Sequence, residues 1–501
     1  MKKCLLSAIA ILCVEFLWAV PATPYPFQIT QPDGSVITVK LCGDEHASYY
    51  TTIDGTPLRK LDNGFFMEDY TIQDDYIRRA TQRRKDVQSK AQATTYPLNG
   101  SPKSLVLLVG FKDLPFKQDL EDFNALLNES GYSYNKASGS CRDYFIAASD
   151  SIFQPQFDVY GPFTLSNNME YYGGDEGDGH DKNAHVMIIE ACQMAVENGV
   201  DLDEYDTDNN GVLDNVFVYY AGHNQAEGAP DNTIWPHMNN LSVLDRFVDG
   251  KKIASYACTS EYSGSTGTRR ASIGTFCHEF GHVLGLPDFY DTDYKHYTVS
   301  NWDIMCSGSY NDSGRTPPTY SAYERFYLGW LTPQQLTEKG QYTLTPLTQD
   351  AQAYLIASGA HNLKGDGPSP NEFFLLEYRT RTGWDAYLPG QGMLIWHIDY
   401  LPSAWANNTP NNGPNFLRIH LEEANGISWK DRGSNENGKS SDPYPGTQKV
   451  TTFLPKLHDG TVLSDQNLFD ITENNGWISF IYQGIGDVKL VTDVQELSLT
   501  T

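Results

Sequence analysis

The sequence is poor in basic residues, and it has no long apolar run after residue 20. Lys and Arg total 36 against 63 Asp and Glu, which gives a formal net charge of -27 and a pI near 4.7. Nucleic acids and anionic membranes carry charge of the same sign, so the composition argues against both as partners. A transmembrane span needs about 18 or more consecutive apolar residues. None follows the N-terminal stretch, so no transmembrane anchor is expected.

Cysteine is also scarce, with 8 in 501 residues. Cys4 and Cys13 fall in the apolar N-terminal stretch, and spacing alone does not reveal how the others pair. The sequence has no internal repeat, which excludes a solenoid or a repeat array. A chain of 501 residues is too long for one ordinary domain and is expected to form two or three.

The N-terminal residues are typical of a signal peptide. Met1-Lys2-Lys3 precede an apolar run from Cys4 to Val20, and Val20-Pro21-Ala22 suits cleavage after Ala22. Residues 1–22 are therefore predicted to direct export. The mature protein is expected to be secreted or held in the cell envelope.

Residues 23–98 are predicted to form a separate β-rich segment. Apolar and polar residues alternate between Phe27 and Leu41, with Pro32-Asp33-Gly34 as a turn, which is typical of a hairpin. Basic residues at 78–79 and 83–85 and a polar stretch up to Pro97 then indicate an exposed helix or linker that other proteases can cut. We expect a propeptide. The alternative is an accessory β-module that stays attached.

The rest of the chain divides into two kinds of pattern. Within residues 99–338, a strand at 104–111, helices at 119–129, 140–148 and 183–197, and strands at 216–220 and 253–258 predict an α/β domain. Within residues 339–501, short apolar strands at 373–378, 393–398 and 477–482 alternate with loops rich in Asn, Gly and Pro, which is typical of a β-sandwich. The predicted fold class is α+β.

The most informative stretch is His-Glu-Phe-Gly-His-Val-Leu-Gly-Leu-Pro-Asp at 278–288. On a helix, His278 and His282 share a face and can bind one metal ion, with Glu279 beside it facing a water molecule. Gly285 can end the helix, and the reversal lets Asp288 return as a third ligand. Three protein ligands leave a fourth position open, as catalytic zinc requires.

Residues 302–308 place Met305 in a turn rich in Gly and Ser, like the Met-turn beneath the zinc of metzincin peptidases. Met305 is expected to support the site by packing. Gly281 inside the helix costs about 1 kcal/mol relative to alanine, so something other than helix propensity is expected to require it. Tyr310, five residues after Met305, is the candidate to stabilise the oxyanion. The alternative is an ordinary packed tyrosine.

Three stretches resemble the immune inhibitor A family of secreted metallopeptidases, family M6: residues 274–291, the Met305 turn, and residues 321–325 with 328–330. The resemblance extends from 31–34 to 390–399 and covers most of the chain. It implies a metzincin-like zinc peptidase domain in which Asp replaces the usual third His, in agreement with Asp288. Glu324 stays open as the alternative third ligand, because gluzincin-type enzymes place theirs on a downstream helix.

A second group of polar side chains precedes the strand expected at 216–220. Alternate oxygen-bearing residues ending in a glycine resemble the first half of an EF-hand loop: Asp206, Asp208, Asn210, Gly211 and Asp214. Position twelve is Phe217, not Glu, so Asp214 at position nine must supply the later ligand. The loop is predicted to bind Ca²⁺ for stability through Asp206, Asp208, Asn210 and Asp214. A solvated acidic turn is the alternative.

Together these patterns predict a zinc-dependent endopeptidase that acts on protein or peptide substrates, uses Zn²⁺ and structural Ca²⁺, and is made as a latent precursor. The sequence around Cys42 loosely resembles the thiol switch of matrix metallopeptidase propeptides, so its thiolate is a candidate blocking ligand. Two other functions stay open: a secreted calcium-dependent protein that binds glycan or matrix, and a zinc amidase acting on cell wall. Glu279 favours hydrolysis, because a purely structural zinc has four protein ligands and no base.

Overall fold

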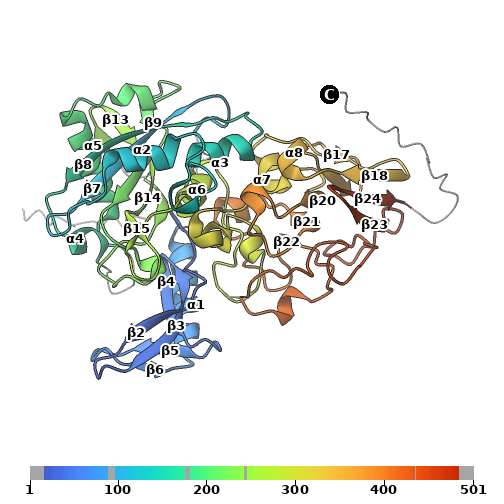
Figure 1. Cartoon of the computed structure of the whole chain (residues 1–501), viewed down its shortest axis with the longest axis horizontal. Coiled ribbons are helices and arrows are strands. Elements are labelled where there is room, and N and C mark those ends of the chain that lie inside the picture. Colours follow the sequence, from blue (N-terminus) through green and yellow to red (C-terminus); the bar gives the residue numbers. More distant parts are fainter. Residues whose placement is uncertain (1–15, 88–95, 175–180, 242–244, 435, 484–501) are drawn as a thin grey trace, which may run out of the picture.

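The computed structural model describes residues 16–87, 96–174, 181–241, 245–434 and 436–483. Most of the predicted signal peptide and the end of the predicted linker lie outside the described residues. An N-terminal sheet, a central α/β part and a C-terminal β-rich part follow one another along the chain (Figure 1). The mixed α+β class is therefore confirmed.

The central sheet has six strands in the order β1-β11-β14-β10-β7-β8. Their bounds are β1 (Phe16–Trp18), β7 (Lys103–Gly110), β8 (Gln156–Thr164), β10 (Val216–Tyr220), β11 (His237–Asn240) and β14 (Ser255–Ser260). Strands β8, β7, β10 and β14 pair in parallel, whereas β11 and β1 are antiparallel additions at one edge. Without β1, β11 would be an edge strand with open backbone groups.

Helices cover both faces of this sheet, which explains the apolar runs of its strands. Val106 and Leu108 of β7 pack on one side with α2 (Leu120–Asn128), α3 (Cys141–Ala148) and α6 (Ile273–Val283). Leu105, Leu107 and Val109 pack on the other side with α5 (Ala184–Glu197). The three helices predicted before α6 differ from α2, α3 and α5 by one residue at most at either end.

The N-terminal part is a five-stranded antiparallel sheet in chain order, β2-β3-β4-β5-β6, followed by helix α1 (Ile72–Val87). The strands are β2 (Phe27–Thr30), β3 (Val36–Asp44), β4 (Ala47–Thr51), β5 (Pro57–Lys60) and β6 (Phe66–Glu68). The predicted turn at Pro32-Asp33-Gly34 joins β2 to β3. In Figure 1 this sheet lies below the central part, with β4 toward it and β6 away from it.

The C-terminal part contains two sheets, with orders β17-β19-β20-β21-β22 and β18-β24-β23. The strands are β17 (Gln334–Gln335), β18 (Gly340–Leu344), β19 (Tyr354–Ala357), β20 (Glu372–Arg379), β21 (Gly392–Asp399), β22 (Ile419–Leu421), β23 (Leu468–Asn474) and β24 (Trp477–Tyr482). Phe374 and Leu376 of β20 share a core with Ile478 and Phe480 of β24.

The opposite face of β20 packs toward the central part. Phe373 and Leu375 belong to the same buried cluster as Phe276 and Phe280 of α6. One hydrophobic core therefore crosses the boundary expected at residues 338 and 339. The two parts are held together by apolar burial rather than joined only by a linker.

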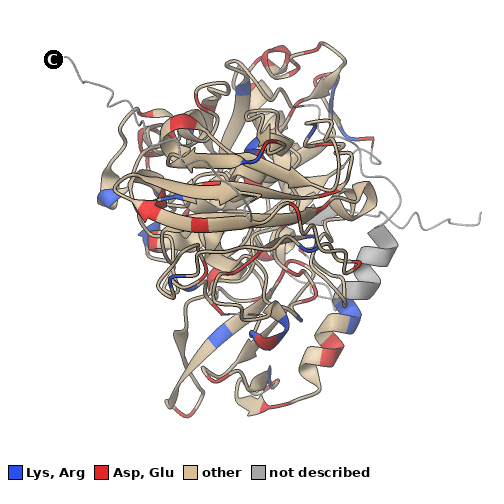
Figure 2. Cartoon of the chain, turned by 90° about the vertical axis from the view of Figure 1, so that its right-hand side faces the viewer, with Lys and Arg blue, Asp and Glu red and all other residues tan. Residues whose placement is uncertain are grey.

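The remaining elements are short: α4 (Met169–Gly173), α7 (Ala322–Tyr327), α8 (Leu347–Asp350), α9 (Pro402–Ala406), β9 (Val212–Leu213), β12 (Phe247–Val248), β13 (Lys251–Ile253), β15 (Tyr262–Ser263) and β16 (Arg269–Arg270). In the described parts of the chain, no helix is long and apolar enough to cross a membrane. Acidic residues are distributed over many elements of the face shown in Figure 2. The six cysteines of the described residues are buried and unbridged.

Candidate active site

Helix α6 carries the first three candidate site residues, His278, Glu279 and His282, all buried. Gly285, with φ of 99°, follows the helix, a left-handed conformation that glycine adopts without steric cost. The N–H of Leu286 then donates to the carbonyl of Gly281, which closes the helix end. The chain reverses there and brings Asp288 back to the two histidines, as the spacing predicts.

The structure brings one atom each of His278, His282 and Asp288 to a common point. Asp288 Oδ1 lies 3.3 Å from His278 Nε2 and 3.4 Å from His282 Nε2. None of the three atoms has a hydrogen-bond partner, although all are buried. Ligands about 2.0 to 2.2 Å from a tetrahedral ion lie about 3.3 to 3.6 Å apart. The donor set and its spacing therefore fit Zn²⁺.

Each histidine is oriented by its other nitrogen. His278 Nδ1 lies 2.7 Å from the carbonyl oxygen of Ile304, and His282 Nδ1 lies 2.8 Å from that of Leu286. A carbonyl only accepts, so Nδ1 carries the proton in each neutral ring, and Nε2 of the neutral ring then has a lone pair. Such outer hydrogen bonds fix the tautomer that a metal ligand needs.

The candidate ligand Asp288 is held by Asn408, which comes from the C-terminal part. Asn408 Nδ2 donates to Asp288 Oδ2 at 2.6 Å, and the N–H of Asp288 donates to Asn408 Oδ1 at 2.6 Å. Sequence reasoning missed Asn408, because it lies 120 residues downstream with no local signal. The C-terminal part thus contributes directly to the geometry of the site.

Burial and the neighbouring charges shift the pKa of each of these buried groups, and burial lowers the pKa of His282. Burial disfavours a charged His278, yet Asp288 and Glu279 outweigh it and raise the pKa of His278 to about 8. Burial likewise opposes ionisation of Asp288, but the two histidines hold its pKa at about 2. Burial raises the pKa of Glu279 to about 8. A buried carboxylate facing two imidazoles is an environment that a cation would stabilise.

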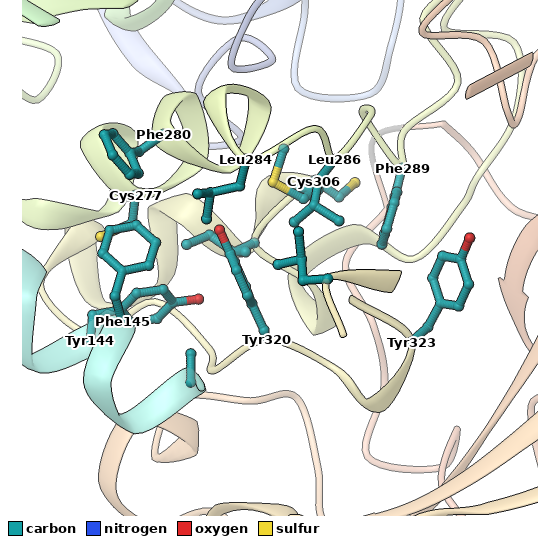
Figure 3. Packing of buried hydrophobic residues seen from close by; sticks show 14 of the residues in the cluster. Tyr144, Phe145, Cys277, Phe280, Leu284, Leu286, Phe289, Cys306, Tyr320 and Tyr323 are labelled. Carbon is teal, nitrogen blue, oxygen red and sulfur yellow. The ribbon is translucent and has the colours of Figure 1, made fainter. Parts of the chain in front are cut away.

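Met305 lies directly beneath the helix, and it explains Gly281. A Cβ at Gly281 would be 2.6 Å from Met305 Sδ and 3.0 Å from Tyr320 Oη, so a side chain there would force the packed side chain of Met305 to shift. Figure 3 shows Phe280 and Cys277 of α6, Tyr144 and Phe145 of α3, and Tyr320 in one packed cluster. The aromatic packing fixes α6 from below and so positions its ligand-bearing face.

Glu324, the alternative third ligand, caps a different helix. Its carboxylate accepts the N–H of Ser321, and the hydroxyl of Ser321 accepts the N–H of Glu324, which forms a capping box at the start of α7. The group of converging ligand atoms contains Asp288 and not Glu324.

Residues 18–23, which we call the strap, lie across the candidate site. The N–H of Val20 donates to Glu279 Oε1 at 2.8 Å, and the ring of Trp18 packs edge-on against that of His282 with centroids 5.2 Å apart. Strand β1, which shares Trp18 with the strap, pairs antiparallel with β11, and Trp18 lies opposite Met238. The sequence analysis assigned residues 18–22 to a signal peptide and Thr23 to the β-rich segment, and it did not anticipate this position.

Two tyrosine hydroxyls hold carbonyls of the strap. Tyr310 donates to the carbonyl of Pro21 at 2.7 Å, and Tyr290 donates to that of Ala19 at 2.7 Å. Tyr310 therefore contacts the backbone of the strap two residues after Ala19, the residue that Tyr290 contacts. Tyr290 was missed, although it stands two residues after Asp288 in the sequence.

Cys42 is not among the converging ligand atoms. It lies on the N-terminal sheet and is buried with Ala47 and Tyr49 in the same large core as α6, and its Sγ lies 3.9 Å from Thr51 Oγ1. Backbone of the strap, rather than this thiol, occupies the position next to Glu279.

The acidic loop uses its carboxylates internally. Asp206 accepts the N–H groups of Asn210 and Gly211 and pairs with Lys251, whose Nζ lies 2.7 Å from Asp206 Oδ2. Asp208 accepts the N–H and the side-chain amide of Asn210, and Asp214 accepts from Thr207. Lys251 thus already supplies one positive charge to the loop.

The C-terminal part holds a second cluster with ligand-type atoms, formed by His397, His420 and His458. Both ring nitrogens of His397 are engaged, at 2.8 Å by Glu422 and at 2.9 Å by Glu372. Burial disfavours a charged His397, but the two carboxylates outweigh it and raise its pKa. His397 is thus held by two ion pairs.

Residues 92–331 match the catalytic domain of the Immune inhibitor A peptidase M6 family. This region contains α6, Asp288, Tyr290 and Met305, and it is an M6-type metallopeptidase domain. The family resemblance stated from sequence is confirmed.

Among curated proteins, the Pre-pro-metalloprotease PrtV of Vibrio cholerae serotype O1 is 27% identical over 284 residues, which are 47% of this chain and 31% of that protein. Immune inhibitor A of Bacillus thuringiensis subsp. alesti is 26% identical over 268 residues, 44% of this chain and 38% of that protein. The matched region thus spans roughly a third of each relative.

Proposed function

We propose that the protein is an exported zinc endopeptidase that hydrolyses protein substrates, with His278, His282 and Asp288 as metal ligands and Glu279 as general base. One observation carries the proposal. Three buried, unpartnered ligand atoms converge beside a carboxylate that already contacts the N–H of a peptide bond. A hydrolase needs both groups at one peptide, whereas a structural metal site needs neither a base nor access to peptide.

Zinc bound here would polarise the scissile carbonyl and lower the pKa of a water molecule toward neutrality. Glu279 takes the proton of that water and returns it to the leaving amine, which in the strap corresponds to the nitrogen 2.8 Å from its Oε1. Asn408 keeps Asp288 in place during the reaction. Met305 and the aromatic cluster keep α6 rigid beneath it.

We also propose that the chain is made as a precursor, with residues 1–22 as signal peptide and residues 23–98 as propeptide. The relative PrtV is itself described as a pre-pro-metalloprotease. The N–H of Thr23, the first residue of the proposed propeptide, donates to the carbonyl of Ala226 at 2.8 Å, and the carbonyl of Gly43 in the N-terminal sheet accepts the N–H of Ala22 at 2.8 Å. The hydroxyl of Tyr294 donates to the same carbonyl. Residues 99–338 form the proposed catalytic domain and residues 339–501 a β-sandwich domain packed against it.

Incubation of the processed protein with denatured protein and with peptidoglycan tests the function. Denatured protein is expected to be cut at internal bonds, a zinc chelator to abolish the cleavage, and stoichiometric Zn²⁺ to restore it. Release of peptidoglycan fragments with no cut in protein would identify a cell-wall amidase instead. Binding of glycan or matrix with neither reaction would identify a binding protein.

For the acidic loop we propose a structural Ca²⁺ bound through Asp206, Asp208, Asn210 and Asp214, in addition to the ammonium of Lys251. A ligand that binds only the folded state stabilises it by about 2.7 kcal/mol at a hundredfold excess over its Kd. Added Ca²⁺ is therefore expected to raise the unfolding temperature by several degrees, and Asp208→Ala to remove the shift. An unfolding temperature that is the same with and without Ca²⁺ would mean that Lys251 and the N–H donors alone neutralise the loop.

A further inference from the structure

The strap satisfies the backbone groups around a single peptide bond in the way that a bound substrate would. The bond between Ala19 and Val20 has its carbonyl oxygen on the hydroxyl of Tyr290 at 2.7 Å and its N–H on Glu279 Oε1 at 2.8 Å. One end of the bond thus meets a hydrogen-bond donor, and the other meets the proposed general base.

The contacts continue on both sides of this bond. Upstream, β1 adds to the open edge of β11, which supplies sequence-independent backbone pairing. Downstream, the indole N–H of Trp235 donates to the carbonyl of Val20 at 3.0 Å, and Tyr310 donates to that of Pro21. An extended peptide is therefore held from four residues before to two residues after the bond.

The side chains beside the bond indicate which residues fit. Ala19 and Val20 are fully buried, and Val20 belongs to an apolar cluster with Ala226, Trp235 and Tyr310. A charged side chain at the position of Val20 would lose its hydration without a partner among these three residues.

We propose that the strap shows the substrate register of the enzyme: the cleaved bond takes the place of Ala19–Val20, a small residue precedes it and a compact apolar residue follows it, and Tyr290 is the catalytic residue that binds the carbonyl oxygen. Tyr310 binds the substrate two residues further on. This inference rests on the proposed function, because it assigns roles for the same hydrolysis. The Tyr290 hydroxyl stabilises the oxygen as it gains negative charge, whereas Tyr310 faces a carbonyl that does not react.

The first test uses the processed wild-type enzyme and a capped peptide with the sequence of residues 16–23, Phe-Leu-Trp-Ala-Val-Pro-Ala-Thr. Mass spectrometry is expected to show one cut, between Ala and Val, and a matched peptide with Asp in place of Val is expected to be cut at least tenfold more slowly. If denatured protein is digested but the peptide is cut elsewhere or not at all, the register is wrong and the proposed function stands. If neither is digested, the proposed function itself fails.

The second test compares Tyr290→Phe with Tyr310→Phe. Loss of one oxyanion donor lowers kcat by about 100- to 1,000-fold, so Tyr290→Phe is expected to show a loss in that range with KM within threefold of wild type. Tyr310→Phe is expected to raise KM with kcat within threefold. Bound zinc and the unfolding temperature should match wild type in both, since only hydroxyls are removed. A kcat for Tyr290→Phe equal to that of the wild type would overturn its assigned role.

Discussion

Glu279→Gln is expected to abolish proteolysis while the protein keeps its metal. General-base catalysis contributes about 100- to 10,000-fold, and an amide cannot take the proton of the attacking water. The amide is isosteric with the carboxylate, and Glu279 is not among the three converging ligand atoms, so metal affinity should persist. The measurement is kcat/KM on denatured protein together with zinc content by elemental analysis.

Glu324→Gln is the matched control, because Glu324 is equally buried and was the alternative ligand. A glutamine in its place still completes a capping box, so zinc content and rate should stay near wild type. His282→Ala should lose both zinc and activity. Proteolysis by Glu279→Gln at the wild-type rate, or loss of zinc in Glu324→Gln, would contradict the site as we assign it.

The second large effect concerns latency. A chain that retains the strap is expected to be inactive, because the strap fills the positions on both sides of the scissile bond. A tethered occupant at an effective concentration near 1 mM, whose own dissociation constant is like a substrate KM of about 10 to 100 μM, lowers the rate by roughly 10- to 100-fold.

Partial removal separates the contributions of the strap and the N-terminal sheet. A chain that begins at Thr23, the expected product of signal cleavage, keeps Thr23 bonded to the carbonyl of Ala226 and Tyr25 bonded to that of Tyr310. It should cut short peptides that end near the scissile bond and remain slow on long proteins. Cutting at an engineered protease site within residues 88–95, followed by removal of the fragment from Thr23 to the cut, should release full activity.

The control for the latency experiment is Glu279→Gln cut at the same engineered site, which should stay inactive and so exclude a contaminating protease. Equal rates on long proteins before and after the cut would show that residues 23–98 are an accessory module. Unchanged latency in Cys42→Ala would agree with its buried place beside Tyr49.

Local sequence signals predicted the elements that carry their own chemistry. Helix α6 and its end at Gly285 follow from the helical spacing of its residues and from a glycine that can adopt positive φ, and α3 follows from its helical pattern; the capping box that Ser140 and Asp143 form was not predicted. Strand β8 was not predicted, because Gly161 and Pro162 interrupt its sequence pattern. It lies at the edge of the sheet, where the missing N–H of a proline is tolerated.

What the sequence could not reveal depends on partners far along the chain. Strand β11 is short and polar, and only its pairing with β14 defines it. The hydrogen bonds of Asn408 to Asp288 span 120 residues, and that of Val20 to Glu279 spans 259. No periodicity or spacing rule reports such contacts. Tyr290 differs from these residues, because it lies only two residues after the proposed ligand Asp288 in the sequence.

The position of Asn408 late in the sequence determines when the site can become complete during synthesis. A ribosome releases the segment from His278 to Asp288 well before it has made Asn408, which follows 120 residues later. Until then Asp288 lacks both hydrogen bonds that orient its carboxylate, so a partly synthesised chain carries an incomplete centre. A chain truncated before Asn408 is accordingly expected to bind a metal ion at this centre more weakly than the full chain does.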